Sequence, residues 1–594
     1  MTYQIRGNQH GVPVGVPETI ADDTLSVLPV VPADWVYDAF QRVSPADYDR
    51  LRRFKIVPIT WMPTKTIAAV VDEIGLAEAK RLGMPVVGRV LLTDYRKALR
   101  QHFGIPLLKQ TTHHLQRLMP EASASSRVTP AQTLWFTVLW LSALLIWMLL
   151  GAGVLALLLG LASGGFFCMV ITLRVLCLMP VRQPQRIRPP APLDLSNLPI
   201  YTVLVPLFRE TKVLRQLLNA LAILSYPPQR LDIKLILEET DSGMQRAVGE
   251  MQLPSHFDVI VVPAGFPQTK PRALNYAMAF ARGSLVTIYD SEDIPDPGQL
   301  LRAVQAFHEA DEDVACLQAR LRFYNPAENW LAQQFSTEYA TLFDVMLPAL
   351  ADNGLPLLLG GTSNHFRMDC LKQVGGWDPF NVTEDADLGI RLARMGYRTQ
   401  SLDSITHEEA NIRVGNWLKQ RRRWLKGFLQ TWLVHNRHPI DTFRMLGLGG
   451  FCTMQCMTLG VFASALLHPF LVAAGIWCLL PAQLAGSQGL SLASVMAGLD
   501  LVLLVAGYAT AAFAMKRAMQ VAGLPSWPKM VLTLPIYWSL LSIAAWQAVF
   551  DFLIAPFHWH KTEHGLSWQM QQARPMQPRP PLRKRRIIYT PAQE

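Results

Sequence analysis

Charged residues are scarce in this chain of 594 residues. Asp, Glu, Lys and Arg make up 17% of it, whereas about a quarter is usual in soluble domains. Hydrophobic residues reach 50%, and this composition predicts a membrane protein with membrane lipids as partners. The net charge of +10 does not call for nucleic acid, because basic residues of membrane proteins gather on the cytoplasmic side. We expect no nucleic-acid partner.

Cysteine is also sparse, with seven residues in the whole chain. Cys452 and Cys456 lie in an apolar run without His or Cys partners at metal spacing, so neither a disulfide framework nor a thiolate metal site is expected. The opening stretch "MTYQIRGNQHGVPVG" lacks the apolar core of a signal peptide. We therefore expect the first segment to stay in the cytoplasm.

Long apolar runs are present in two places. Residues 133–179 are almost uncharged and predict a hairpin of two spanning helices, broken near "GAG" and "SGG". Further apolar runs cover 446–481, 493–515 and 530–554. The basic residues that follow these runs should face the cytoplasm, which is satisfied if 530–554 lies in the membrane interface. This arrangement gives four spanning helices, with six as the alternative, and a cytoplasmic tail over 555–594.

Two soluble regions are expected. Residues 1–30 are polar and predict a disordered lead-in, and residues 31–125 predict a small α/β domain. That domain should contain a strand in "FKIVPITWM", a helix from Thr66 to Leu82, a strand in "PVVGRVLL" and a helix in "TDYRKALRQHFG". Residues 195–438 alternate apolar strands with helical patterns, which predicts a mainly parallel sheet covered on both faces. Its ligand should sit beyond the carboxyl ends of the strands.

Acidic residues follow two of these strands. "IKLILEETD" ends in a cluster that includes Glu239 and Asp241, which could bind the base and ribose of a nucleotide or form a solvated turn. "VTIYDSEDIPDP" places Asp290, Glu292 and Asp293 after the next strand. Such oxygen ligands suit Mg²⁺ or Mn²⁺ on a diphosphate, although an ordinary acidic loop is the alternative.

Basic residues open the helix before that acidic loop. Lys270 and Arg272 in "TKPRALNYA" could meet phosphate at a helix start.

Two later helices carry further candidates. "NVTEDADLGIRLARMG" sets Glu384 and Asp385 at a helix start, where acids suit the helix dipole and where one of them could be a general base. "NWLKQRRRWLKGFLQTW" carries Gln420, Arg423 and Trp424. It predicts a basic amphipathic helix at a membrane surface, yet a surface anchor does not need these three residue types at this spacing.

Taken in order, these motifs resemble those of membrane-embedded, processive family 2 glycosyltransferases, similar to bacterial cellulose synthases. The family shows a strand-end carboxylate, a D-x-D metal motif, a T-E-D motif and Q-x-x-R-W. Here they are matched by Glu239 with Asp241, by Asp290 with Glu292 or Asp293, by "TED" at 383–385 and by "QRRRW" at 420–424. The resemblance implies a GT-A-like domain inserted between transmembrane helices.

The resemblance also implies a reaction. Asp385, beside Glu384, would accept a proton from an acceptor hydroxyl, while the metal and Arg423 would neutralise the leaving diphosphate and Trp424 with Gln420 would bind the acceptor sugar. One displacement inverts the anomeric carbon. We expect a processive enzyme that uses a nucleotide sugar, with a UDP-sugar as the expected donor, to extend a β-linked exopolysaccharide through a bacterial inner membrane. The alternatives are a non-processive enzyme acting on a lipid carrier and a nucleotide-binding receptor or transporter.

Two further resemblances concern the ends of the chain. "FHWHKTEHG" is similar to a W-x-K-T-x-H-G segment of related synthases, which would bring Lys561 and His564 near phosphate; a plain polar tail is the alternative. Residues 31–125 loosely resemble the N-terminal domain of type II secretion ATPases, some of which bind cyclic di-GMP. Arg81, Arg89 and Arg96 could contact that nucleotide, and a docking or assembly domain, with periplasmic export proteins as further partners, is the other interpretation.

Overall fold

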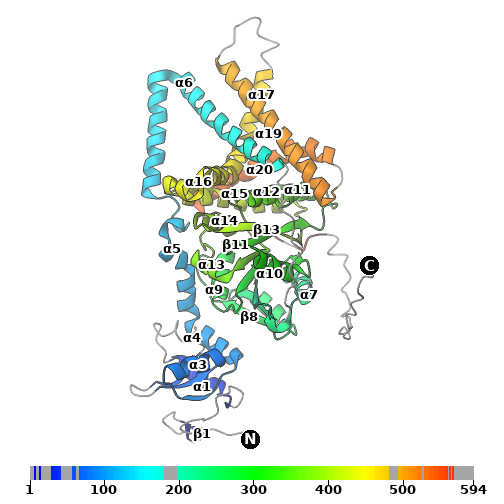
Figure 1. The fold of residues 1–594 in the computed structure, drawn as a ribbon. Helices are drawn as coiled ribbons and strands as arrows, with labels where there is room; N and C mark the ends of the chain where they lie inside the picture. The colour runs from blue at the N-terminus through cyan, green and yellow to red at the C-terminus, as the bar shows by residue number, and fades with distance from the viewer. Residues whose placement is uncertain are drawn as a thin grey trace. The chain divides into compact units, whose positions relative to one another are not determined.

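The computed structural model describes residues 6–7, 13–14, 28–41, 56–61, 66–179, 197–479, 492–524, 527–559, 561–563 and 565–567. The chain divides into two units, Met1–Thr112 and His113–Glu594, which are described separately (Figure 1). Most of the expected lead-in, the basic stretches after 179 and in the tail, and His564 lie outside the described residues.

The first unit is an α/β fold. Its three-stranded sheet pairs β3 (Ile56–Trp61) antiparallel with β4 (Thr66–Val70), and β4 parallel with β5 (Val86–Arg89). The remaining elements are α1 (Ala33–Gln41), α3 (Glu73–Arg81), α4 (Leu92–Thr112) and the two-residue strands β1 (Arg6–Gly7) and β2 (Pro13–Val14).

The helix predicted from Thr66 to Leu82 is wrong in its first part, because Thr66–Val70 forms strand β4. Thr, Ile and Val at these positions suit a pleated sheet. The helix α3 starts only at Glu73, where the Asp72 side chain accepts a hydrogen bond of 3.0 Å from the Gly75 backbone N–H. The Asp72 N-cap therefore determines where the helix begins, whereas the alanine content alone suggested an earlier start.

The second unit is built on an eight-stranded sheet with the order β10-β13-β11-β12-β9-β6-β7-β8. The strands are β6 (Tyr201–Leu207), β7 (Leu231–Glu238), β8 (Phe257–Val262), β9 (Leu285–Ile288), β10 (Ile294–Pro295), β11 (Val314–Phe323), β12 (Asn364–Arg367) and β13 (Arg398–Glu408). Strand β12 is antiparallel to both neighbours, and β10 is antiparallel to β13. The sheet is therefore mixed: four of its seven strand pairings are parallel, as expected from the sequence, and the three that involve β10 or β12 are antiparallel, which the sequence did not predict.

The physical reason lies in β12. This four-residue strand has the sequence NHFR, without the apolar run that marks a buried parallel strand. The strands that carry such runs, β6 to β9, do pair in parallel. Their carboxyl ends meet at one edge of the sheet, which is where loops after parallel strands form binding sites.

Helices surround this sheet (Figure 1). They are α5 (His114–Leu118), α7 (Leu214–Ala222), α8 (Ser242–Gly249), α9 (Lys270–Met278), α10 (Gln299–Glu309), α11 (Trp330–Ala340), α12 (Leu347–Asp352), α13 (Met368–Gln373), α14 (Glu384–Arg394) and α15 (Val414–His435). Short 3₁₀ turns cover Pro120–Ala122 and Pro228–Arg230, and a π-helical turn covers Thr341–Met346. Tyr201, Leu217 and Phe307 belong to the core that joins the sheet to α7 and α10.

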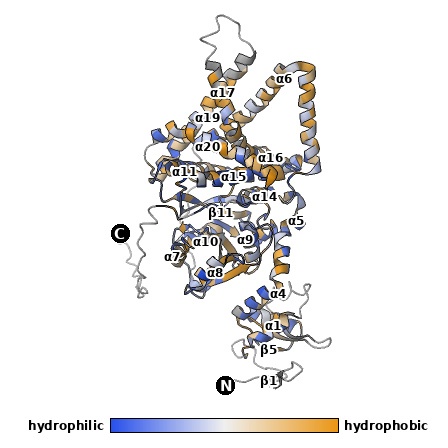
Figure 2. Cartoon of the chain, turned by 180° about the vertical axis from the view of Figure 1, so that it is seen from behind, coloured by the Kyte–Doolittle hydropathy of each residue, from blue (hydrophilic) through white to orange (hydrophobic). Residues whose placement is uncertain are grey.

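Apolar helices form the rest of the second unit: α6 (Pro130–Leu178), α16 (Pro439–Gln455), which runs through a π-helical turn (Cys456–Gly460) into α17 (Val461–Leu479), α19 (Leu492–Ala522) and α20 (Trp527–Ile554). Within the described residues, four helices are long and apolar enough to cross a membrane, by length and composition: Pro130–Leu178, Pro439–Ala474, Gly498–Ala522 and Pro528–Ile554. Figure 2 shows mostly apolar colouring along α6.

The long helix α6 bends into two arms (Figure 1). The bend falls at Gly151, whose φ of +84° is a conformation that glycine adopts without steric cost. The break expected near "GAG" is therefore present, whereas "SGG" at 163–165 continues as helix. The interfacial position expected for 530–554 stays a prediction, and this segment is the α20 helix.

Candidate active site

A cavity of about 840 Å³ opens at the carboxyl ends of the parallel strands. The loops after β6 and β9, the start of α14, one face of α15 and the segment after α20 line it. The sequence-predicted residues among its lining are Lys270, Asp290, Glu292, Glu384, Asp385, Gln420, Arg423, Trp424 and Lys561. Folding thus brings together residues from positions 270 to 561.

The acidic loop after β9 presents two of its three acids to the cavity. Asp290 and Glu292 line it. Asp293 is fully buried and turned into the loop, where its Oδ2 accepts hydrogen bonds from the Asp290 backbone N–H (2.7 Å) and from the Thr362 hydroxyl. Burial, followed by the charges of Asp290 and Glu292, raises the pKa of Asp293 well above its usual range. Asp293 therefore shapes the loop from behind.

In the part of the chain that the structure describes, no group of three His, Cys, Asp or Glu residues could hold a metal ion. Asp290 and Glu292 are the two acids of the loop after β9 that line the cavity. A site of this kind suits Mg²⁺, which usually takes one or two carboxylates and completes its shell with substrate phosphates and water.

Lys270 links the acidic loop to the opposite wall. Its Nζ lies 2.5 Å from Asp290 Oδ1 and donates to the Gly361 carbonyl at 2.7 Å. Burial alone would lower the pKa of Lys270, but the carboxylates of Asp290, Glu384 and Asp385 outweigh it and raise the pKa above its usual value. The lysine is therefore a fixed positive charge among three acids.

Helix α14 begins at Glu384, so both acids of the "TED" motif sit in its first turn. Thr383 occupies the N-cap position without a side-chain capping bond. Burial raises the pKa of Asp385, and burial together with the Asp385 charge raises the pKa of Glu384 to about 8. A carboxylate with a raised pKa is a stronger base than a solvated one, which suits proton transfer near neutral pH.

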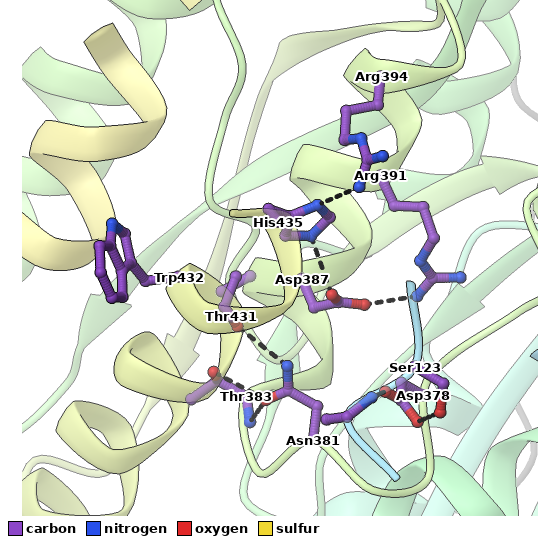
Figure 3. Close-up of polar contacts among 12 residues, drawn as sticks. Ser123, Asp378, Asn381, Thr383, Asp387, Arg391, Arg394, Thr431, Trp432 and His435 are labelled. Atoms are coloured by element: carbon purple, nitrogen blue, oxygen red, sulfur yellow. Dashed lines mark hydrogen bonds and ion pairs between the residues drawn. The ribbon is translucent and has the colours of Figure 1, made fainter. Parts of the chain in front are cut away.

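A buried polar network holds this helix from behind (Figure 3). Asp387 accepts from Arg391 at 2.7 Å and lies 3.0 Å from His435 Nε2, at the end of α15. His435 Nδ1 lies 3.0 Å from the Arg394 guanidinium, and the Asn381 amide donates to the Thr431 hydroxyl at 3.0 Å. These contacts tie the "TED" turn to α15.

The three arginines of "QRRRW" point to different places. Arg421 forms a 2.6 Å ion pair with Glu338 of α11 and also donates to Tyr537 of α20. Arg422 pairs with Asp551 of α20. Arg423 lines the cavity with its guanidinium 4.3 Å from the centre of the Trp559 ring. Arg421 and Arg422 therefore connect α15 to α11 and α20 through ion pairs. The sequence predicted a basic helix at a membrane surface and did not predict these ion pairs.

Aromatic rings form another wall of the cavity. Trp424 stacks on Tyr339 with ring centroids 6.1 Å apart and planes at 25°, and both residues line the cavity. Gln420 lies beside them and accepts a 2.9 Å hydrogen bond from the Asn411 amide. This wall offers an apolar face next to polar groups, as sugar rings require.

The segment after α20 forms part of the cavity lining. Lys426 donates to the carbonyls of Ala555 and His558, and the Glu409 carboxylate accepts backbone N–H bonds from residues 565–567. Lys561, which lines the cavity, lies 3.1 Å from Glu210 Oε1. The described residues between 555 and 567 are thus held against the site.

Four predicted residues are not among those that line the cavity: Glu239, Asp241, Arg272 and Asp293. Asp241 is the N-cap of α8 and also accepts from the Arg209 backbone N–H at 2.5 Å. Glu239 accepts from the Ala264 N–H at 2.8 Å, near the surface. Arg272 is fully buried in a 2.5 Å ion pair with Glu238.

Glu238, the first acid of the expected strand-end cluster, lines the cavity at the end of β7. Two other carboxylates in the lining were missed by sequence reasoning, Glu210 and Glu408. Glu408 is the last residue of β13, and position at the carboxyl end of a strand is the signal that could have found it.

The three arginines expected to contact cyclic di-GMP belong to the first unit. Arg81, at the end of α3, pairs with Glu78 at 2.7 Å and its side chain is 70% exposed. Arg89 ends β5 and its backbone bonds to Pro29 and Val31. Arg96 lies in α4, and its side chain is outside the described residues.

Comparison with known proteins identifies the class of this domain. Residues 199–427 match the family described as "Glycosyltransferase like family 2". The chain therefore contains a glycosyltransferase family 2 domain, and its mixed sheet is of the GT-A-like type.

Among curated relatives, the chain is 26% identical over 242 residues to the "Probable glycosyltransferase YdaM" of Bacillus subtilis, covering 39% of this chain and 56% of that one. It is 26% identical over 257 residues to "Cellulose synthase 2" of Novacetimonas hansenii, covering 42% and 15%. A "Beta-monoglucosyldiacylglycerol synthase" of Synechocystis is 27% identical over 271 residues, covering 44% and 56%. The chain thus spans about half the length, or less, of these relatives.

Among solved structures, a mannosyltransferase from Pyrobaculum calidifontis in complex with GDP-Man and Mn²⁺ aligns with a TM-score of 0.40 at 17% identity, covering 66% of this chain and 98% of that one.

Proposed function

We propose that this chain is a processive, inverting glycosyltransferase of a bacterial inner membrane, which extends a β-linked exopolysaccharide from a nucleotide-sugar donor and passes it across the membrane. The observation that carries the proposal is the convergence of Asp290 with Glu292, of Asp385 and of Arg423 with Trp424 on one cavity. These are the groups that a sugar transfer to a hydroxyl requires, and each comes from a different part of the chain.

The diphosphate of the donor would bind at the acidic loop. Asp290 and Glu292 would hold a divalent cation, Mg²⁺ or Mn²⁺, because hard carboxylate oxygens suit these ions. Such an ion, when bound, supplies positive charge for the leaving diphosphate. Lys270, Arg423 and Lys561 add fixed positive charge around the same space. Glu239, an exposed carboxylate directly after β7, would bind the nucleoside.

Asp385 would be the general base. It would accept the proton of the acceptor hydroxyl while the bond to the anomeric carbon forms and the bond to the diphosphate oxygen breaks. Glu384 would keep a second carboxyl beside it, and the "TED" turn would be held in place by Asp387 and Asn381. The diphosphate would leave with its charge next to Arg423.

The acceptor would lie on the wall formed by Trp424 and Tyr339. A ring face beside Gln420 suits a pyranose, since the apolar face of the sugar can stack while its hydroxyls reach polar groups. This observation favours a glycan acceptor.

The alternative acceptor is a lipid. One specific finding favours it, because the relatives at similar identity include enzymes named as β-monoglucosyldiacylglycerol synthases. In that case the same base and donor site would make a glycolipid in a single transfer.

Turnover of radiolabelled nucleotide sugars by the purified full-length chain in lipid vesicles separates these proposals. We expect label in a polymer that resists organic extraction and disappears in the Asp385→Asn variant. Label confined to an extractable lipid would establish the alternative. Absence of transfer from all donors, with nucleotide still bound, would leave a nucleotide-binding membrane protein and refute the proposed reaction.

A further inference from the structure

Glu408 is a buried carboxylate that none of the assigned roles uses. It ends β13, lines the cavity and is 9% exposed. Within the described residues its Oε1 atom has no hydrogen-bond partner. A buried, unpartnered carboxylate oxygen costs free energy that a bound donor group would recover.

The strand register places Glu408 beside the acidic loop. Strand β10 pairs antiparallel with β13 through Ile294 opposite His407 and Pro295 opposite Thr406. One step further along the same register brings Asp293 opposite Glu408. The Glu408 carboxyl therefore lies at the edge of the loop that presents Asp290 and Glu292.

On its other side Glu408 approaches the aromatic wall. Tyr339 lines the same cavity, and after burial the Glu408 carboxylate is the largest contribution that raises the pKa of Tyr339. Glu408 thus has neighbours both in the loop of the acids proposed for the diphosphate and in the aromatic wall. In a transfer reaction the transferred sugar must reach both, since that sugar joins the diphosphate to the acceptor.

A metal ion is a poor match for Glu408. Although Asp290, Glu292 and Glu408 are among the acids that line the cavity, no three His, Cys, Asp or Glu residues in the described ranges form a group that could hold an ion. A sugar hydroxyl, in contrast, needs only one carboxyl oxygen as its hydrogen-bond acceptor, and several acids do not have to meet at one point.

We propose that Glu408 accepts a hydrogen bond from a hydroxyl of the donor sugar and so contributes to the choice of sugar. The proposal rests on the transferase function proposed above and deepens it by assigning a specificity residue. A site that bonds a substrate hydroxyl discriminates against analogues that lack it, because the buried polar group is then left unpaired.

The experiment measures kcat/KM of the full-length protein, in nanodiscs with Mg²⁺. UDP-glucose, UDP-N-acetylglucosamine and UDP-N-acetylmannosamine are tested first, and then the 3-, 4- and 6-deoxy forms of the donor that is used. For the wild type we expect one deoxy position to lower kcat/KM by roughly 3- to 10-fold, the range for a lost hydrogen bond between uncharged groups, because burial and the neighbouring acids raise the pKa of Glu408 well above its usual range. In Glu408→Ala, kcat/KM for the natural donor should fall by about the same factor relative to the wild type. The deoxy analogue at that position should then react with the variant as well as the natural donor does.

Two further variants make the result specific. Glu408→Gln keeps a hydrogen-bonding oxygen of the same shape and should recover most of the discrimination lost in Glu408→Ala. Glu312→Ala removes an exposed glutamate from the α10–β11 loop and should match the wild type at every position. The affinity for UDP with Mg²⁺ should stay within about twofold in the Glu408 variants, which also shows that they are folded.

Three outcomes would overturn the proposal. Deoxy penalties in Glu408→Ala that equal those of the wild type would show that Glu408 touches no donor hydroxyl. A tenfold loss of UDP affinity that more Mg²⁺ restores would make Glu408 a metal ligand. If the wild type turns over no nucleotide sugar at all, the transferase function itself fails and the role of Glu408 fails with it, a result distinct from the first two.

Discussion

Gly361 decides how closely the charged groups of the cavity approach one another. A Cβ atom at this position would lie 3.1 Å from Asp385 Oδ2 and 3.7 Å from Lys270 Nζ. Without that atom the Gly361 carbonyl can accept a hydrogen bond from Lys270 while Asp385 lies directly beside Gly361. At the residue scale the site therefore depends on one absent side chain as much as on the side chains present.

Asp385→Asn should abolish sugar transfer, because an amide keeps the shape of the carboxylate but accepts no proton. We expect kcat to fall by roughly 10²- to 10⁴-fold, with UDP affinity unchanged in calorimetry. The matched control is Asp311→Asn, since Asp311 lies at the surface, where its side chain is 81% exposed. Transfer at near the wild-type rate in Asp385→Asn would remove this residue from the role of base.

The rate of transfer should fall on the acidic side of neutrality. Burial raises the pKa of Asp385, and the base works only when deprotonated, so activity is present above this pKa and is lost as pH falls through it. Arg423 lowers the same pKa, and hence Arg423→Gln should move the acid limb of the kcat profile to higher pH. Because Glu384 titrates together with Asp385, the measured value belongs to the pair. A limb that moves to lower pH would contradict the assignment.

Chelation should stop transfer, and added Mg²⁺ or Mn²⁺ should restore it. Glu292 lines the cavity whereas Asp293 is turned into the loop. Glu292→Gln should therefore raise the metal concentration for half-maximal activity by roughly tenfold, since one of two carboxylate ligands is lost. Asp293→Asn should leave that concentration unchanged even if the rate falls. Full activity in excess chelator would exclude a metal at this loop.

Helices α14 and α15 act as a pair, and their contact determines where the base lies. α14 carries both Asp385 and Asp387 in its first turn, and Asp387 reaches the last residue of α15, His435. The middle of α15 is tied to α11 and α20 by Arg421 and Arg422. The helix that presents Arg423 and Trp424 to the cavity is thus fixed in its middle and at its end by charged contacts.

Asp387→Asn should destabilise the second unit. Burial alone would raise the pKa of Asp387, but Arg391 and His435 outweigh it and hold the pKa below its usual value. Removing this charge leaves Arg391 buried with one anionic partner fewer, a change that costs about 3–5 kcal/mol. We expect the midpoint of thermal unfolding in detergent to fall by roughly 3–5 °C, because the unfolding entropy of a unit of this length is about 1 kcal/mol/K.

The control for this variant is again Asp311→Asn, which breaks an exposed ion pair with Arg398. Exposed pairs contribute about 0–1 kcal/mol, so its midpoint should stay close to that of the wild type. Equal midpoints for Asp387→Asn and Asp311→Asn would show that the buried network does not hold the fold.

At the scale of the whole molecule, the chain joins a separate α/β unit to a transferase domain set among apolar helices. The residues found to line the cavity belong to His113–Glu594, and none of the steps proposed above is assigned to Met1–Thr112. We expect a role in regulation or docking for the first unit.

Cyclic di-GMP is the regulator that the resemblance of residues 31–125 suggests. We expect the full-length protein to bind it with a Kd of about 1 µM or lower in calorimetry, and Arg81→Ala to weaken binding by about tenfold, because the exposed guanidinium can meet a phosphate. Lys80→Ala removes the same charge from the same helix and serves as the control. Absence of binding to the wild type would leave the docking role, with export proteins as partners.

The sequence alone determined the elements with strong local signals. Apolar runs predicted β6 to β9 and the long apolar helices, since burial on both faces of a sheet or in lipid leaves few positions for charge. Motif order placed Asp290, Asp385 and Trp424 as candidates before any contact was known. Where local signals were weak, as in the "TIAAV" of β4 or the polar β12, the prediction was wrong or missing.

Only the tertiary structure decided which neighbours in sequence share the cavity. Glu238 lines it and Arg272 does not; Glu292 faces it while Asp293 points into the loop; Arg423 enters it while Arg421 and Arg422 bind other helices. Adjacent residues share the same sequence pattern. The orientation of each side chain is set by partners tens or hundreds of positions away in the sequence, such as Thr362, Glu338 and Asp551. Which of several acids or arginines becomes functional is therefore a property of packing, because packing alone chooses which charges are paired and which are left to meet a substrate.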